Sequence, residues 1–124
     1  MDIKEKISKI VPEVTFTEQN DLIAIIPAAS FRKVAESLRH DAEDPMDYLR
    51  DIVGMDWGET LGALYYLEST QTYKRIALRT ETADRETPLL PSVCDLWQTA
   101  EIKEREAYDF FGIKFVGNPD MRRL

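Results

Sequence analysis

Two glutamates near the C-terminus, Glu104 and Glu106, are the residues whose type and spacing first suggest chemistry. Paired carboxylates supply the acid and the base of glycoside hydrolysis, in which both groups must converge on one bond. In a helix, residues two apart point about 160° away from each other, since each residue turns by about 100°. These carboxylates cannot easily face one substrate, so a hydrolase site is the weaker hypothesis.

The single histidine and the single cysteine are the other candidates for a base, a nucleophile or a metal ligand. His40 follows a candidate helix and has no Cys, His or Ser partner at motif spacing, which favours a surface position near a helix C-terminus. Cys94 cannot form an internal disulfide, and with only His40 it cannot hold zinc or an iron–sulfur cluster. We expect Cys94 to be a small packed residue, and the sequence predicts no cofactor and no metal site.

Composition narrows the class of protein and of partner. The 124 residues, 44% of them hydrophobic, are enough for one core and therefore predict one domain. A formal charge of −7 opposes binding to a phosphate backbone, so nucleic acid is not an expected partner. No apolar run approaches the ~20 residues that cross a bilayer, and the N-terminus lacks the apolar core of a signal peptide. We expect a cytoplasmic location.

The first half of the chain carries two helix patterns and a hairpin pattern. Periodicity predicts a helix over residues 3–10 and strands around residues 14–16 and 22–26, which would pair as a hairpin. Ser30 is a plausible N-cap for a second helix, whose expected inner face is Phe31, Val34, Ala35 and Leu38. The acidic stretch from Asp41 to Asp44 is expected to be a solvated loop.

Three neighbouring strands are predicted next, over residues 51–57, 61–69 and 73–82. Residues 84–91 form a polar, proline-bracketed stretch that we interpret as a loop. With a last helix, the order becomes helix, two strands, helix, three strands, helix. This order predicts a single α+β domain over residues 1–124, with helices packed on one mixed or antiparallel sheet and an extended C-terminal tail.

The last helix has the strongest signals at its ends. Ser92, with Asp95 three residues later, resembles a capping pattern, so a helix is predicted from there to Phe111, with a break near residues 98–99 left open. Gly112 is expected to be its left-handed C-cap.

This predicted helix, residues 97–111, has an unusual apolar face. At about 100° per residue, one stripe contains Trp97, Ala100, Tyr108 and Phe111. Glu104 falls in the middle of that stripe, where a core residue is expected. Ile102, Glu106 and Phe110 lie roughly opposite and form a second, weaker apolar face. Such a helix can be sandwiched between its own sheet and another protein.

The charges on this helix have two interpretations. Arg105 lies four residues from both Glu101 and Asp109, a spacing that allows ion pairs worth about 0.5 kcal/mol or less when exposed. Desolvated against a partner, a pair that loses one member costs about 3–5 kcal/mol. A solvated face is the ordinary alternative, but a carboxylate on the apolar stripe, followed by a turn at residues 117–120 and a basic tail, favours docking.

One ordered pattern now resembles a known family, the C-type or 30 kDa subunit of respiratory complex I, the NADH–quinone oxidoreductase. It comprises Pro91-Ser92-Val93, Trp97, Ala100 and the continuous string from Glu104 to Leu124. Residues 46–69 resemble the family more weakly. Two positions depart from it: the family usually has histidine at the place of Asn118 and commonly tryptophan at that of Ile102.

The resemblance implies a non-catalytic structural and assembly subunit in the peripheral arm of a proton-translocating complex of the respiratory electron-transport chain, without a cofactor of its own. The implied partners are the large quinone-site subunit, which is of the D type, and neighbouring iron–sulfur subunits. Membrane contact would be indirect, on the cytoplasmic side of the inner (cell) membrane. The equivalent subunit of an energy-converting membrane-bound hydrogenase is the alternative.

The expected docking residues lie on the last helix and in residues 113–124, the turn and tail. They are Trp97, Glu104, Arg105, Glu106, Asp109, Pro119, Asp120, Arg122 and Arg123.

Overall fold

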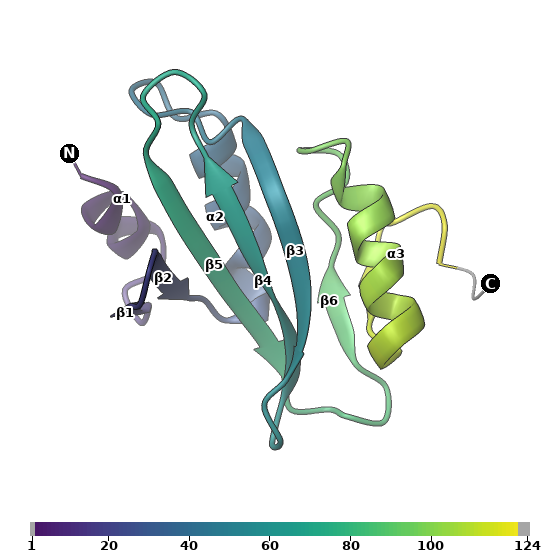
Figure 1. Ribbon diagram of the computed structural model, residues 1–124. Coiled ribbons are helices and arrows are strands. Elements are labelled where there is room, and N and C mark those ends of the chain that lie inside the picture. The colour runs from purple at the N-terminus through teal and green to yellow at the C-terminus, as the bar shows by residue number, and fades with distance from the viewer. Residues whose placement is uncertain (1, 122–124) are drawn as a thin grey trace.

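The computed structural model describes residues 2–121 and shows one α+β domain, which confirms the predicted fold class (Figure 1). Its helices are α1 (Ile3–Ile10), α2 (Ala28–Arg39) and α3 (Ala100–Phe111). Its strands are β1 (Thr15–Glu18), β2 (Leu22–Ile25), β3 (Tyr48–Asp56), β4 (Leu61–Glu68), β5 (Arg75–Thr82), β6 (Leu89–Pro91) and β7 (Lys114–Val116).

The main sheet is mixed, as predicted, and has the strand order β1-β2-β5-β4-β3. Strand β2 runs parallel to β5, whereas β1 with β2, β4 with β5 and β3 with β4 are antiparallel pairs. The predicted hairpin is confirmed, since Thr15 lies opposite Ile25 and Glu18 opposite Leu22.

A second, two-stranded parallel sheet of β6 and β7 was not predicted. The stretch over residues 84–91, interpreted as a loop, contains β6 in its last three residues. Strands of three residues carry no measurable alternation, and β6 pairs with a segment on the far side of α3. Only the tertiary contact reveals it.

The core lies between α2 and one face of the main sheet, while the opposite face stays open (Figure 1). The predicted inner face of α2 is confirmed, because Phe31, Val34, Ala35 and Leu38 are all buried. Phe31 packs on Tyr65 of β4 with ring centroids 4.7 Å apart. Helix α3 lies beside β3 (Figure 1), where its Ala107 and Phe111 approach the backbone of Gly54.

Three local predictions need correction. Helix α2 begins at Ala28 after Pro27, and not at Ser30, because the fixed φ of proline already suits a helix entry. The segment from Asp41 to Asp44 is a loop, as predicted, but it is only partly solvated, since Ala42 and Glu43 are exposed whereas Asp41 and Asp44 are not. Its carboxylates surround the Lys6 ammonium, with Asp41 at 2.8 Å and Asp44 at 3.8 Å, and both acids are mostly buried.

The third correction concerns α3, which begins at Ala100 and not near Ser92. Residues 94–96 and 98–99 form turns instead, so the helix is interrupted near residues 98–99, the break that the sequence left open. The Ser92 hydroxyl accepts a hydrogen bond from the Cys94 N–H, as a capping residue does, and donates one to Glu104. The expected left-handed cap is confirmed, with Gly112 at φ 74°. Within residues 2–121, none of the helices combines the length and apolarity that crossing a bilayer requires.

Candidate docking site around α3

Glu104 lies at the junction of three chain segments and has 0% of its surface exposed. Its Oε1 accepts hydrogen bonds from the Ser92 hydroxyl at 2.6 Å and from the Asn118 side-chain amide at 2.9 Å. Its Oε2 accepts one from the Val93 N–H at 2.8 Å. One carboxylate therefore joins the segment after β6, the middle of α3 and the turn after β7.

The protonation of Glu104 is shifted by this environment. Burial raises the pKa of Glu104 above its ordinary value of 4.5, and the negative charge of Asp95 raises it further. The three hydrogen bonds to the carboxylate work in the opposite direction. Tyr65, also buried, has its pKa raised by desolvation first and by Glu104 second. The group is arranged as an internal acceptor, without access to a substrate.

The segment that carries Ser92 is held by α2 and by the loop before β3. Arg32 of α2 donates to the Ser92 carbonyl at 2.7 Å and pairs with Asp95 at 2.6 Å, and this hydrogen bond lowers the pKa of Asp95. Trp97 donates from Nε1 to the Met46 carbonyl at 2.9 Å and is only 4% exposed. Residues 92–97, which precede α3, are thus bonded both to α2 and to the loop before β3.

Asn118 organises the turn after β7, a role that the sequence did not indicate. Its amide donates to the Glu101 carbonyl at 3.1 Å as well as to Glu104, and its Oδ1 accepts from the Asp120 N–H at 2.8 Å. The sequence marks this residue only as part of a turn and as a departure from the family pattern. A turn pattern predicts that an asparagine can occupy this position, but it does not predict which distant residue accepts a hydrogen bond from its amide.

Arg105 pairs with Asp120 at 2.7 Å and not with Glu101 or Asp109, the expected partners on its own helix. The turn after β7 folds back along α3, so Asp120 supplies the better-placed carboxylate. This contact joins two of the predicted docking residues into one surface with α3.

The predicted docking residues fall into two groups, those at the surface and those in the interior. Glu106, Asp109 and Pro119 are exposed, and Arg105 and Asp120 are half-buried beside them. Trp97 and Glu104 lie in the interior, so any part they have in docking passes through the residues they hold in place. Arg122 and Arg123 lie outside the described residues.

The second apolar face of the helix is exposed, as the pattern indicated. Phe110 is 85% exposed and Ile102 66% exposed. A groove of about 390 Å³ runs between this side of α3 and β3, and Phe110 and Phe111 form part of its wall. A helix that is buried on one side and apolar on the other is typical of a protein–protein contact.

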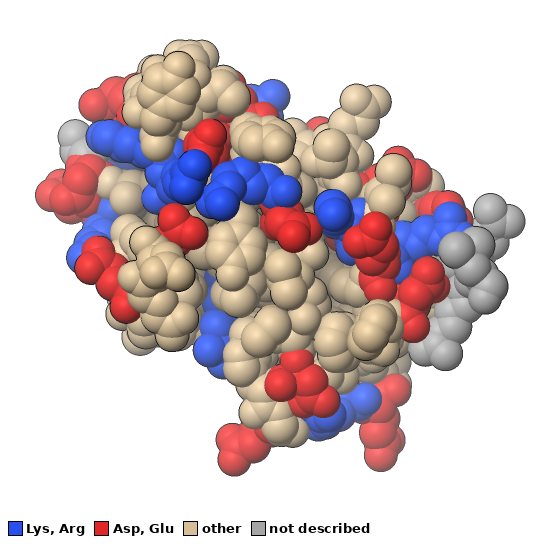
Figure 2. Space-filling model, in the orientation of Figure 1, with Lys and Arg blue, Asp and Glu red and all other residues tan. Residues whose placement is uncertain are grey.

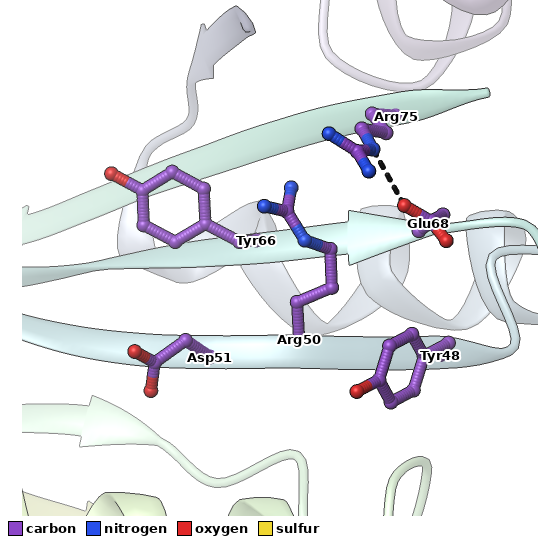
Figure 3. Close-up of a pocket in the computed structure, with 6 residues that line it drawn as sticks. All are labelled: Tyr48, Arg50, Asp51, Tyr66, Glu68 and Arg75. Carbon is purple, nitrogen blue, oxygen red and sulfur yellow. Dashed lines mark hydrogen bonds and ion pairs between the residues drawn. The ribbon is translucent and has the colours of Figure 1, made fainter. Parts of the chain in front are cut away.

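A separate hollow of about 500 Å³ lies on the open face of the main sheet (Figure 3). Its lining comes from β3, β4 and β5 and consists of Tyr48, Arg50, Asp51, Tyr66, Glu68 and Arg75. Two cations and two carboxylates balance each other there, and Arg75 is bonded to Glu68 (Figure 3). No set of groups converges in this hollow as a reacting centre would require.

The lone histidine and cysteine take structural positions. His40 is the C-cap residue of α2, as predicted. Cys94 is half-buried, with its Sγ 3.9 Å from the Gly117 carbonyl oxygen. Across residues 2–121, no three His, Cys, Asp or Glu side chains cluster in a way that could hold a metal ion.

Fold and site together describe a small α+β domain that presents one helix face above a buried carboxylate. Residues 24–124 match the family model described as "Respiratory-chain NADH dehydrogenase, 30 Kd subunit". The chain belongs to this family, which confirms the resemblance seen in its C-terminal pattern.

Individual relatives agree with this assignment. The C/D-type subunit of NADH-quinone oxidoreductase from Phocaeicola vulgatus is 51% identical over 100 residues, covering 80% of this chain and 19% of the relative. The C-type subunit of the same enzyme from Chloroherpeton thalassium is 33% identical over 123 residues, covering 98% of this chain and 51% of the relative. The chain thus spans about a fifth to a half of the length of these relatives.

A solved structure shares the fold. A chain in the membrane-bound sulfane sulfur reductase, an archaeal respiratory membrane complex, superposes with a TM-score of 0.79 over 97% of this chain and 72% of its own length. Its sequence identity is 24%, so the likeness concerns the fold alone.

Proposed function

We propose that this chain is a structural and assembly subunit in the peripheral arm of an NADH–quinone oxidoreductase, where it docks on the large quinone-site subunit and its iron–sulfur neighbours. Family membership and the names of the relatives support the complex. The designation "C/D" of the more similar relatives supports a partner of the D type. Relatives named NADH-quinone oxidoreductase favour this complex over a membrane-bound hydrogenase.

The observation that carries the proposal is the two-sided character of α3. One side is fixed to the domain through Glu104, while the other exposes Phe110 and Ile102 to solvent. Exposed apolar side chains on an ordered helix are stabilised when a partner covers them. The docking surface consists of this face together with Arg105, Glu106, Asp109, Pro119 and Asp120. We include residues 113–124 in it as the docking segment.

The chain acts without catalysis of its own. Glu104 lies inside the domain and Glu106 on its surface, so the two carboxylates cannot converge on one bond. The domain would lie on the cytoplasmic side of the inner (cell) membrane and reach that membrane only through the complex.

Affinity purification of the chain, tagged at its N-terminus, from solubilised membranes of its own organism tests the proposal. We expect the large quinone-site subunit and its iron–sulfur neighbours to co-purify with the wild-type chain. Asp109→Lys reverses a charge on the docking surface and should reduce recovery several-fold, whereas Glu18→Lys on β1 makes the same change on the opposite side of the domain (Figure 1) and should not. Failure of the wild-type chain to recover these subunits would refute the proposal.

A further inference from the structure

We propose that the groove between β3 and α3 receives a segment of the partner protein in which a bulky apolar side chain is flanked by arginine or lysine. This inference rests on the proposed docking function and adds the chemistry of the partner. It concerns one part of the surface, the β3–α3 groove, whose apolar lining consists of Ile52, Val53, Gly54, Ala107, Phe110 and Phe111.

The shape of the groove suits a single large apolar side chain. Its volume is about 390 Å³, and Gly54 of β3 lies where α3 packs most closely on that strand. A Cβ at Gly54 would come within 2.7 Å of the Phe111 ring and 3.3 Å of the Ala107 Cβ. Val53, 37% exposed, borders the opposite side. The absence of a side chain at Gly54 therefore lets α3 pack closely on β3, and this close packing brings the two walls of the groove together.

Phe110 stands at the mouth of the groove as an aromatic anchor. It is 85% exposed, yet its ring packs against that of Phe111, with centroids 5.4 Å apart. An aromatic side chain that already packs against a neighbouring ring loses little rotational freedom when a partner covers it. Residues of this kind carry a large share of binding energy in protein interfaces.

The charges around α3 determine which sign of charge the partner segment should carry. The groove and the neighbouring hollow on α3 are lined by five carboxylates and two cations, namely Asp51, Glu101, Glu106, Asp109, Asp120, Lys103 and Arg105. Lys103 lies 3.4 Å from Asp51, and Arg105 pairs with Asp120, so the cations are already engaged. Figure 2 shows acidic groups over this side of the molecule, with a smaller number of basic groups between them.

This excess of negative charge selects a basic occupant. Electrostatic complementarity favours a partner that brings arginine or lysine beside its apolar side chain. A second copy of this chain, with a formal charge of −7, would add repulsion instead. An acidic segment is excluded on the same ground.

Photo-crosslinking in the assembled complex tests the occupant directly. The photoreactive residue benzoylphenylalanine replaces Phe110 in the full chain, and mass spectrometry identifies the crosslinked peptide. We expect a peptide of another protein with a bulky apolar residue within a few positions of Arg or Lys. The same replacement at Tyr73, 76% exposed in the β4–β5 turn, is the control for chance contacts and should not yield that peptide.

Outcomes of the crosslinking separate this inference from the docking function. Assembly of the complex with no crosslink from position 110, or with a crosslink to a second copy of this chain or to an acidic segment, would overturn the groove and leave the docking function standing. A wild-type chain that never assembles would overturn both.

Affinity for the recovered peptide, made synthetically, gives an independent measure. Phe110→Ala should weaken its binding roughly tenfold or more, because an aromatic anchor is lost. Glu106→Gln should weaken binding and flatten its salt dependence, since screening acts on charge pairs. Glu18→Gln, a matched change on exposed β1, should bind as the wild-type chain does. Equal affinity of the Phe110→Ala variant would contradict the proposal.

Discussion

At the scale of single residues, Glu104 decides how the C-terminal third is held together. Three donors from two other segments end on its carboxylate, and none of its surface meets solvent. A buried donor that loses its acceptor keeps its full desolvation cost. Removing Glu104 should therefore cost more free energy than its hydrogen bonds contribute as a net gain to folding. The residue marked by its odd position on an apolar stripe is therefore a structural centre.

Removing that acceptor should destabilise the domain. Glu104→Ala leaves the Ser92 hydroxyl and the Val93 N–H without their acceptor in the interior and removes one of the two acceptors of the Asn118 amide, so we expect the free energy of unfolding to fall by about 2–4 kcal/mol. Urea denaturation followed by circular dichroism measures this change. Glu106→Ala, on the exposed side of the same helix, is the control and should change stability by about 0.5 kcal/mol or less. Equal effects of both substitutions would contradict the internal role.

The pH dependence of the unfolding free energy should follow from the direction in which the pKa of Glu104 is shifted. Because burial raises its pKa above 4.5, folded Glu104 keeps a proton that the unfolded chain has released. The stability it contributes is therefore complete below pH 4.5 and is lost as the pH rises through the folded pKa. Asp95, whose pKa Arg32 lowers, contributes with the opposite sign, above its ordinary 3.8.

Comparison with Glu104→Gln isolates this contribution, since Asp95 titrates in both chains. The stability advantage of the wild-type chain should be largest near pH ~4 and should shrink toward pH ~7. Urea midpoints across that range measure it. An advantage that grows with pH would show that the hydrogen bonds outweigh burial and that the pKa is lowered.

At the scale of elements, the contact between α3 and β3 depends on one missing side chain. Gly54→Ala places a Cβ 2.7 Å from the Phe111 ring, so we expect a loss of about 1–3 kcal/mol in unfolding free energy. Phe111→Leu should relieve part of this loss, and a double-mutant cycle by urea denaturation measures the coupling.

Gly58 provides the matched control for that cycle. It lies at φ +87° with no atom within 4 Å of an added Cβ, so Gly58→Ala is destabilising through backbone strain alone. Its effect should add to that of Phe111→Leu without coupling. A cycle at Gly54 that is also additive would show that α3 does not rest on β3 as described.

At the scale of the whole molecule, the two sheets are joined into one cooperative unit. Trp97 bonds the Met46 carbonyl, and Arg32 bonds the Ser92 carbonyl, so segments far apart in the chain share one core. We expect thermal unfolding to show a single transition. Two single-tryptophan chains, one keeping Trp57 and one keeping Trp97, test this: within each chain, circular dichroism and fluorescence should give the same midpoint. Separate midpoints for the two probes within one chain would show that the C-terminal part unfolds independently.

Sequence alone determined much of this protein. The helical face of α2, the hairpin of β1 and β2, the three long strands and the Gly112 cap follow from local periodicity and from glycine's backbone freedom. The family also followed from sequence, since its pattern runs in order from Pro91, is continuous from Glu104 to Leu124, and lies within the residues that match the family model. These features depend on neighbours along the chain, which a sequence displays.

Tertiary structure alone decided what the charged and turn residues do. The sequence showed that Glu104 lies on an apolar stripe but could not show that Ser92 and Asn118 donate hydrogen bonds to it. Nor could it show that Arg105 pairs with Asp120 and not with the acids on its own helix. It also hid the pairing of β6 with β7 and the burial of Asp41 and Asp44 around Lys6. Each of these depends on groups brought together across the fold, where distance and desolvation, rather than spacing along the chain, determine which partner is bound.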